Sequence, residues 1–238
     1  MLINTESRST EEELMDDFTM EGATLAKTLK DIAKLNRWLG GNKITLDGVT
    51  FLLNNLTKDK EYVIVDIGCG NGDMLREIAQ FGRNKGYRFK LVGVDANMFT
   101  IKKAKELSTA YQEIEYLVEN IFDESYAKRE FDIVLCTLTL HHFDNQQISD
   151  LLKTICAQAK VGVVINDLQR SKLAYYLFKL VCVIFISNPM ARYDGAISIL
   201  RGFKKRELLN FTKTLPLVFH RIRWRWAFRY QWIIKKTK

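Results

Sequence analysis

The stretch EYVIVDIGCGNGD at residues 61–73 constrains the fold of this chain more than any other part. Its first half is a run of β-branched apolar residues, which is typical of a strand covered on both faces of a sheet. Three glycines then alternate with other residues, and their missing Cβ atoms permit tight curvature and let a ligand approach the backbone: Gly68, Gly70 and Gly72. Apolar residues at helical spacing follow from Leu75 onward. The stretch therefore predicts a strand, a loop and a helix of nucleotide-binding type.

Two details of this loop favour a cationic ligand over a dinucleotide. A dinucleotide fingerprint requires a third glycine at the position of Asp73, where it lets a helix pack beside a pyrophosphate. Asp66 and Asp73 also place negative charge where a phosphate would bind. S-adenosylmethionine carries a sulfonium group, an ammonium group and no phosphate, so it suits the loop better.

The segment DIGCGNG at residues 66–72 resembles motif I of the class I S-adenosylmethionine-dependent methyltransferases, in which an acid precedes alternating glycines. The resemblance implies an α/β, Rossmann-like fold with a seven-stranded, mostly parallel sheet in the order 3-2-1-4-5-7-6 and helices on both faces. It also implies that S-adenosylmethionine is the cofactor and that the loop binds it through Asp66, Gly68, Cys69 and Gly70.

The next two strands are predicted at residues 89–94 and 114–118. Asp95 ends the first of them at the spacing of the carboxylate that holds a ribose diol, with Ala96 beside it in the cofactor site. By resemblance to the family, Asn120 is expected to hydrogen-bond the adenine amino group and Ile121 to pack against the adenine ring.

The fourth and fifth strands are predicted in the segment FDIVLCTLTLHHF at residues 131–143 and at residues 161–165. By resemblance, residues 137–140 pass beneath the methionine part of the cofactor, which assigns cofactor contacts to Thr137 and Leu138. Helix-length segments separate the five strands, so they are expected to be parallel. Ligands of such sheets bind beyond the carboxyl ends of the strands, next to the first strand.

Helices are predicted before the sheet. Residues 10–39 carry leucines at amphipathic spacing, Thr10 and Glu13 have capping-box spacing, and a glycine pair ends the run. Thr45 is expected to cap a second short helix. The resemblance implies a lid over the cofactor, and core packing is the alternative. One domain is expected, made of a helical lid at residues 1–58, a cofactor-binding core at residues 59–168 and an acceptor side at residues 169–238.

The segment at residues 174–186 is apolar nearly all round, so a helix there must be buried or must face an apolar partner. It is too short to span a membrane and contains Lys179, so no transmembrane segment is expected. In this superfamily the insertion after the fifth strand usually forms the acceptor pocket, which implies a small hydrophobic or aromatic acceptor. A peripheral contact with membrane lipid and a simple core helix remain alternatives.

The C-terminal part explains the formal net charge of +8. From residue 219 onward, arginines alternate with apolar and aromatic residues: Arg221, Arg223, Arg225 and Arg229. This period predicts two closing antiparallel strands with one face buried and one solvated, as the family has. A basic strand with aromatic residues is also compatible with RNA binding. The Asn-Pro-Pro-aromatic motif of base methylation is missing, however, so nucleic acid is not the favoured partner.

Two histidines follow the fourth strand on the ligand-binding edge, and histidine is the natural base near neutral pH. His142 and His141 are therefore the candidate catalytic residues, as a base or as groups that orient the acceptor. The alternative is that they only shape the loop and pack beneath the cofactor. Second-choice acceptor contacts are Asp167 and Arg170, and weaker candidates are Tyr175, Tyr176, Tyr193 and Asp194.

Three short motifs narrow the resemblance: NDLQRS at residues 166–171, RYDG at 192–195 and LRGF at 200–203. They look like bacterial methyltransferases of polyketide or aromatic secondary metabolism, while the overall pattern looks like small-molecule methyltransferases related to the quinone-biosynthesis group. The two resemblances imply O-methylation of a phenol, quinol or polyketide-type metabolite, with C-methylation as an alternative. An RNA methyltransferase and a cofactor-binding protein without methyltransferase activity remain rival hypotheses. The four cysteines are dispersed and no secretory signal is apparent, so a cytoplasmic location without a metal is expected.

Overall fold

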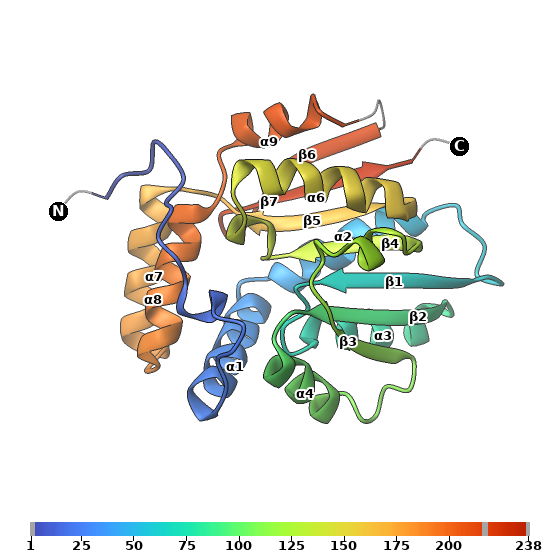
Figure 1. The fold of residues 1–238 in the computed structure, drawn as a ribbon, viewed down its shortest axis with the longest axis horizontal. Helices are drawn as coiled ribbons and strands as arrows, with labels where there is room; N and C mark the ends of the chain where they lie inside the picture. The colour runs from blue at the N-terminus through green and yellow to red at the C-terminus, as the bar shows by residue number, and fades with distance from the viewer. Residues whose placement is uncertain (1–2, 216–218, 237–238) are drawn as a thin grey trace.

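The computed structural model describes residues 3–215 and 219–236. Its centre is a seven-stranded sheet of order β3-β2-β1-β4-β5-β7-β6 with helices on both faces, which confirms the predicted fold class (Figure 1). The strands are β1 (Glu61–Ile67), β2 (Arg88–Asp95), β3 (Ile114–Val118), β4 (Phe131–Thr137), β5 (Ala159–Leu168), β6 (Phe219–Arg225) and β7 (Arg229–Lys235). The helices are α1 (Ala23–Trp38), α2 (Gly41–Leu53), α3 (Asp73–Lys85), α4 (Met98–Leu107), α5 (Glu124–Ala127), α6 (Asn145–Gln158), α7 (Lys172–Phe185), α8 (Pro189–Arg201) and α9 (Lys205–Thr212), with the short 3-10 helices η1 (Leu14–Asp16) and η2 (Leu140–His142).

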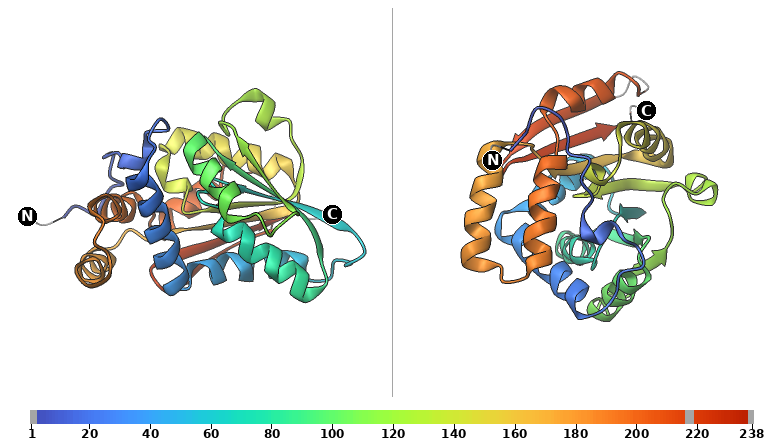
Figure 2. Two further views of the ribbon diagram at one scale, coloured as in Figure 1. Left: turned by 90° about the horizontal axis from the view of Figure 1, so that it is seen from below. Right: turned by 60° about the vertical axis from the view of Figure 1, so that its left-hand side comes forward.

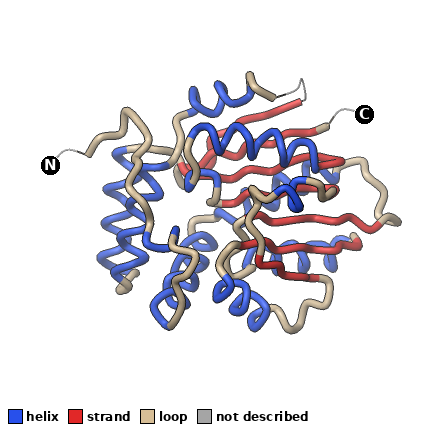
Figure 3. The backbone as a smooth tube through the Cα atoms, in the orientation of Figure 1, coloured by secondary structure: helices blue, strands red, loops and turns tan. Residues whose placement is uncertain are grey.

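The direction of the strands agrees with the sequence. Strands β1 to β5 are parallel, and β7 and β6 join the sheet antiparallel at its edge. The carboxyl ends of β1 to β5 therefore meet at one edge of the sheet. Figure 3 shows the helices α1, α7 and α8 gathered beyond that edge, at the left of the view.

Two hydrophobic cores hold the sheet between its helices. One core contains the apolar side of α6 together with Trp232 of β7, and the other contains the apolar sides of α2, α3 and α4. Strand β1 contributes Val65 to the first core and Ile64 to the second, because successive side chains of a strand point to opposite faces. Each fully buried side chain of this kind stabilises the fold by about 1.5–3 kcal/mol. This two-sided burial fixes the position of the loop that follows β1.

The N-terminal helices differ from the prediction. Residues 10–13 are not helical, and the capping box forms between Glu13 and Asp16 around η1 instead of between Thr10 and Glu13. Helix α2 begins at Gly41, so Thr45 lies inside it, where its hydroxyl accepts a hydrogen bond from the Asn166 amide. The local pattern was misleading because Glu13 and Thr45 both find partners in distant parts of the chain.

Helices α7 and α8 form an antiparallel pair that projects from one end of the molecule, as both views in Figure 2 show. Among the side chains of α7 only Ala174 and Cys182 are buried. The prediction of a simple core helix is therefore wrong. The exposed apolar residues are Leu173, Tyr176, Leu177, Leu180, Val183, Ile184 and Phe185. No helix within residues 3–215 and 219–236 is long and apolar enough to cross a membrane.

The closing strand β6 does not have one buried and one solvated face. It is an edge strand whose side chains are all exposed or half-buried. Its arginine face lies against α2, where Arg221 covers the Phe51 ring at 4.1 Å and Arg225 forms an ion pair with Asp47. The fourth arginine of the predicted alternation, Arg229, begins β7 and is buried.

Two glycines at the ends of α3 allow a matched stability test of the loop after β1. Gly72 and Gly86 both have left-handed backbones, with φ of 75° and 74°. A Cβ on Gly72 would lie 2.0 Å from the Tyr116 hydroxyl, whereas no described atom lies within 4 Å of one on Gly86. Gly86→Ala should cost about 1–2 kcal/mol through backbone strain alone. Gly72→Ala should cost about 1–3 kcal/mol more through overpacking. Urea unfolding of both variants measures the difference, and equal losses would contradict the proposed close approach.

Candidate active site

A cavity of about 760 Å³ opens at the carboxyl ends of the parallel strands. Its walls come from the loop after β1, the ends of β2 and β4, the segment around η1, helices α1, α7 and α8, and the turn between β6 and β7. It brings together every residue that the sequence assigned to the cofactor and both candidate catalytic histidines: Asp66, Gly68, Cys69, Gly70, Asp95, Ala96, Asn120, Ile121, Thr137, Leu138, His141 and His142.

The backbone of the glycine loop explains its composition. Gly68 has φ of 65°, and a Cβ there would lie 2.5 Å from the Thr139 side chain. The Gly70 N–H donates to Asp95 Oδ2 at 3.1 Å, which ties the loop to the end of β2. Asp95 Oδ1 accepts from the Asn97 N–H at 3.0 Å, so both carboxylate oxygens are anchored to backbone. The loop and Asp95 are thus one rigid unit at the cavity wall.

Asp66 is a buried acid with unused hydrogen-bonding capacity. Its side chain is 2% exposed, and within the described part of the chain its Oδ1 has no hydrogen-bond partner. Burial, together with the nearby Asp73 and Asp95, raises the pKa of Asp66 well above its usual value. Burial also raises the pKa of Asp95. A carboxyl group buried in this way is costly to ionise alone and is stabilised in its ionised form by a positive charge, so it suits a positively charged ligand.

The remaining cofactor candidates lie on the neighbouring strand ends. Asn120 is exposed and its Oδ1 accepts from the Phe122 N–H at 3.1 Å, while Ile121 is buried beside it. Leu138 has a left-handed backbone with φ of 55°, and its N–H donates to the Asn166 carbonyl oxygen at 2.9 Å. Strand β4 therefore ends at Thr137, where the chain turns into η2 and carries the histidines over the cavity.

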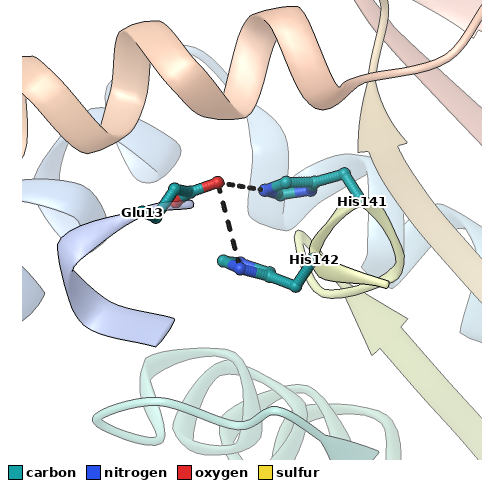
Figure 4. A group of neighbouring side chains, drawn as sticks. All are labelled: Glu13, His141 and His142. Atoms are coloured by element: carbon teal, nitrogen blue, oxygen red, sulfur yellow. Dashed lines mark ion pairs between the residues drawn. The ribbon is translucent and has the colours of Figure 1, made fainter. Parts of the chain in front are cut away.

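His141 is enclosed by two carboxylates. Its Nδ1 lies 2.7 Å from Asp167 Oδ1, and its Nε2 lies 3.4 Å from Glu13 Oε1. Burial alone would lower the pKa of His141, but Asp167 and Glu13 outweigh burial and raise the pKa to about 9. Figure 4 shows the Glu13 carboxyl group facing the rings of both histidines. His141 is thus a fixed polar group of the cavity wall.

His142 is the more accessible of the two histidines, with a side chain that is 22% exposed. Its Nδ1 lies 2.6 Å from Asp16 Oδ1. The other oxygen of Asp16 accepts from Arg201 at 2.5 Å. Burial opposes ionisation of Asp16, but His142 and Arg201 outweigh burial and hold its pKa well below the usual range. The carboxylate therefore orients the imidazole and leaves Nε2 for another partner.

Sequence reasoning missed Glu13 and Asp16 as residues of the site. Glu13 is buried, and its Oε2 accepts a hydrogen bond from the Ser198 hydroxyl at 2.8 Å. The segment that carries the two acids is held by Arg201, whose Nη1 and Nη2 contact Asp16 and the His142 carbonyl oxygen. The available signal was a pair of carboxylates at the spacing i, i+3 next to apolar residues. That pair was not singled out, because Glu13 was read as the partner of Thr10 in a capping box, whereas the capping box of the structure joins Glu13 and Asp16.

The second-choice acceptor contacts take structural roles. Arg170 is fully buried, donates to the carbonyl oxygens of Thr5 and Gly202 and pairs with Glu207. Asp167 holds His141. The described residues that line the cavity include neither Arg170 nor Asp167, and the same is true of all four weaker candidates: Tyr175, Tyr176, Tyr193 and Asp194. Asp194 accepts from the N–H groups of Leu14 and Met15 at 2.8 and 3.3 Å, which docks η1 on α8.

The opposite wall of the cavity is mainly apolar and contains one buried cation. Its apolar residues come from α7, α8 and the turn before β7: Ala174, Leu177, Phe178, Val181, Ile199 and Trp226. Arg229 lines the same wall and is 4% exposed. Its Nε and Nη1 have no hydrogen-bond partner among the described residues, and burial lowers its pKa to about 10. This guanidinium is suited to an anionic oxygen of a bound ligand.

Comparison with known proteins gives a family for the core of the chain. Residues 64–162 match the family described as "Methyltransferase domain". The ubiquinone biosynthesis O-methyltransferase of Rickettsia bellii (strain OSU 85-389) is 28% identical over 117 residues, which are 48% of this chain and 45% of that protein. The protein of the same name from Ralstonia nicotianae (strain ATCC BAA-1114 / GMI1000) is 25% identical over 159 residues, 65% of this chain and 62% of that protein. The chain thus spans less than two thirds of either relative.

Two solved structures share the fold. The plantazolicin methyltransferase BpumL in complex with SAH is 16% identical with a TM-score of 0.65, and the match covers 90% of this chain and 95% of that chain. The magnesium protoporphyrin IX methyltransferase (ChlM) from Synechocystis PCC 6803 with bound SAM is 12% identical with a TM-score of 0.56, covering 86% and 84%.

The parallel sheet, with its glycine loop after β1 and a cavity at the strand ends, defines a Rossmann-like cofactor-binding domain. Among such domains, the family match over the core and the order of the seven strands indicate a methyltransferase domain. They confirm the resemblance to methyltransferases seen in the sequence. The chain is thus similar to the class I S-adenosylmethionine-dependent methyltransferases, through the family match at residues 64–162 and through the shared fold.

Proposed function

We propose that this protein transfers a methyl group from S-adenosylmethionine to a small hydrophobic or aromatic acceptor, by O-methylation of a phenol, quinol or polyketide-type metabolite. The observation that carries the proposal is a single cavity with two kinds of wall. Acids and glycines of the strand ends line one side, apolar residues of α7 and α8 line the other, and His142 lies in the same cavity. The curated relatives named above are O-methyltransferases of ubiquinone biosynthesis, which supports the acceptor class.

The acidic wall fits the charge of the cofactor. Asp66 offers an unpartnered oxygen to a positively charged group, and Asp95 stands at the strand end where a ribose diol is held. Asn120 and Ile121 line the same cavity at the end of β3, and the proposal assigns the adenine to them. In the lid expected at residues 1–58, the cavity-lining residues lie between Glu12 and Leu39, and α2 packs in the core instead. Residues 59–168 then act as the cofactor-binding core and residues 169–238 as the acceptor side.

The reaction requires a deprotonated acceptor oxygen in line with the methyl–sulfur bond. His142 Nε2, oriented through Nδ1 by Asp16, accepts the phenolic proton. The acceptor oxygen then forms a bond to the methyl carbon, and the electrons of the breaking C–S bond return to sulfur, which leaves S-adenosylhomocysteine (SAH). Positioning can contribute about 7–11 kcal/mol to lowering the barrier. A base contributes about 100-fold to 10,000-fold in rate.

The contacts made by the arginines of β6 argue against the RNA hypothesis. Its arginines would have to remain available to phosphates. Arg221 and Arg225 instead pack on α2, and Arg229 lies inside the cavity. The activity test below distinguishes the proposed enzyme from a cofactor-binding protein without methyltransferase activity.

The four cysteines all lie in the described ranges and are free and buried. The cytoplasmic location stays a prediction.

Cofactor binding should depend on Asp95 and on pH. Asp95→Ala should weaken SAH binding at least tenfold, about 1.4 kcal/mol. Because burial raises the pKa of Asp66 and Asp95 in the ligand-free protein, both acids take up protons at a higher pH than ordinary carboxyl groups. SAH carries an ammonium group that favours the ionised acids, so its affinity should be full above these raised pKa values and should fall as pH falls through them. Calorimetric titration of SAH from pH 8 to pH 5 measures both effects.

The control for this titration is Asp123→Ala, which removes an exposed acid outside the cavity and should leave SAH affinity unchanged. An absence of SAH binding to the unmodified protein would contradict the assignment of the cofactor.

Methyl transfer should depend on His142. His142→Gln should lower turnover about 100-fold to 10,000-fold, because the base is lost. SAH affinity should stay within about twofold, since this side chain contributes to the chemical step. Transfer of labelled methyl from S-adenosylmethionine to a panel of phenols and quinols provides the readout. His220→Gln on β6 is the matched histidine control. Undiminished turnover in His142→Gln, or no turnover of any phenol by the unmodified protein, would contradict the proposed reaction.

The outward face of α7 points to a lipid surface as a further partner of the acceptor side. Val183 and Ile184 are 73% and 64% exposed, and Phe185 packs edge-on against the exposed Trp38. Lys34 lies over the Trp38 ring at 4.2 Å, which adds positive charge beside the apolar face. An apolar face flanked by lysine and tryptophan is typical of helices that lie in a membrane interface.

Val183→Asp with Ile184→Asp should abolish flotation of the protein with anionic phospholipid vesicles. The reason is that two charges would have to enter the apolar interface. Leu209→Asp on α9, another exposed apolar position, should leave flotation unchanged. Equal flotation of both variants, or none for the unmodified protein, would remove the lipid surface from the proposal.

A further inference from the structure

Three side chains from distant parts of the chain converge beside the cavity. Glu13 comes from the segment before η1, and His141 and His142 come from the loop after β4 (Figure 4). One potential ligand atom of each residue lies within 4.8 Å of the others. Glu13 and His141 are buried, so water does not compete freely for their polar atoms.

Two of these atoms lack the partners that buried polar atoms normally have. Glu13 Oε1 and His141 Nε2 have no hydrogen-bond partner in the portion of the chain that the structure describes. Each residue uses its second polar atom elsewhere: Glu13 Oε2 accepts from Ser198, and His141 Nδ1 is held by Asp167 at 2.7 Å. The contacts with Ser198 and Asp167 thereby hold Glu13 Oε1 and His141 Nε2 so that these two atoms face each other. An unsatisfied buried polar group is unfavourable, so a bound species between them would stabilise the site.

The distances suit a small cation. Glu13 Oε1 lies 3.4 Å from His141 Nε2 and 3.9 Å from His142 Nδ1. Ligands at about 2.0–2.1 Å from a tetrahedral zinc ion are ~3.3 Å apart. The two separations are close to this value, so a small contraction of the loop would bring the three atoms into coordination range.

The surroundings also match those of histidine ligands. Ligating histidines almost always donate their second ring N–H to a carboxylate or a carbonyl group, which fixes the tautomer and increases the basicity of the ligand atom. The Asp167 carboxylate does this for His141. His142 differs, because Asp16 lies 2.6 Å from Nδ1, the ring atom that also faces Glu13, and this contact must open before an ion can bind there.

We propose that Glu13 Oε1, His141 Nε2 and His142 Nδ1 bind one divalent transition-metal ion of the zinc class, with a further position open toward the cavity. Two imidazoles and one carboxylate with an open position are typical of catalytic zinc sites. The inference rests on the proposed function for its use: the ion would bind the acceptor oxygen and favour its deprotonated form. His142 would then release Asp16 on turning Nδ1 to the metal and would act as a ligand instead of the base, so the phenolic proton would leave to water at the open side of the cavity.

The sequence predicted no such site, because the cysteines are dispersed and the ligands are distant in the chain. The competing explanation is an ionic chain in which a protonated His141 bridges Asp167 and Glu13. That chain needs no metal, so metal binding measured without acceptor separates the two explanations.

The test is calorimetric titration of zinc chloride into EDTA-treated, dialysed protein, together with cobalt chloride titration followed by visible absorption. We expect one ion per chain and ligand-field bands typical of low-coordinate cobalt. Glu13→Gln and His141→Gln should each weaken binding at least tenfold. Asp167→Asn should weaken it about 10-fold to 100-fold through the lost orientation of His141. Glu12→Gln, the neighbouring exposed acid, should bind the ion normally.

Retained SAH binding and an unchanged circular dichroism spectrum identify the variants that are folded. No binding to the unmodified protein, or binding that folded Glu13→Gln and His141→Gln variants retain in full, would overturn the metal site. Phenol methylation that continues in EDTA at an unchanged rate would overturn its role and leave the proposed function intact. Zinc binding of the expected kind without methylation of any phenol would support the site and contradict the proposed function.

Discussion

The buried guanidinium of Arg201 is the interaction on which the geometry of the site depends. It donates to the carbonyl oxygens of His141 and His142 and to the carboxylate of Asp16, so α8, the η2 loop and the N-terminal segment share one cation. A buried cation is tolerated only when its donors have partners, because removal from water is costly. The orientation of His141 and His142 is thereby fixed by a side chain 60 and 59 residues further along the chain.

The charges of the cavity are separated between its two ends. Asp66 and Asp95 are buried at the glycine loop, where burial works against their ionisation, and Arg229 is buried on the opposite wall, where burial works against its charge. Each of these groups is more stable beside an opposite charge. A ligand with a cationic centre and an anionic oxygen would relieve all three, so stability and ligand binding are physically linked in this cavity.

The apolar end of the cavity and the surface of the molecule meet on α7. Ala174, Leu177, Phe178 and Val181 line the cavity, while Leu180, Val183 and Ile184 of the same helix are exposed. An exposed apolar helix face is unusual in a water-soluble monomer and indicates a partner. Helix α7 therefore connects the apolar end of the cavity, where the acceptor would bind, to the exposed surface that an apolar acceptor would reach first.

The sequence by itself determined the parts that depend on local pattern. β-branched runs predicted the strands, and the glycines predicted the loop, which has positive φ at Gly68 and Gly72. Because the strands are parallel, their carboxyl ends meet at one edge of the sheet, and this alone placed Asp66, Asp95 and Asn120 together. Only the tertiary structure decided which side chains meet across long distances. Periodicity describes the face on which a residue lies and not its partner. For this reason the pairing of Glu13 with His141, the burial of Arg229 and the structural role of Arg170 could not be predicted.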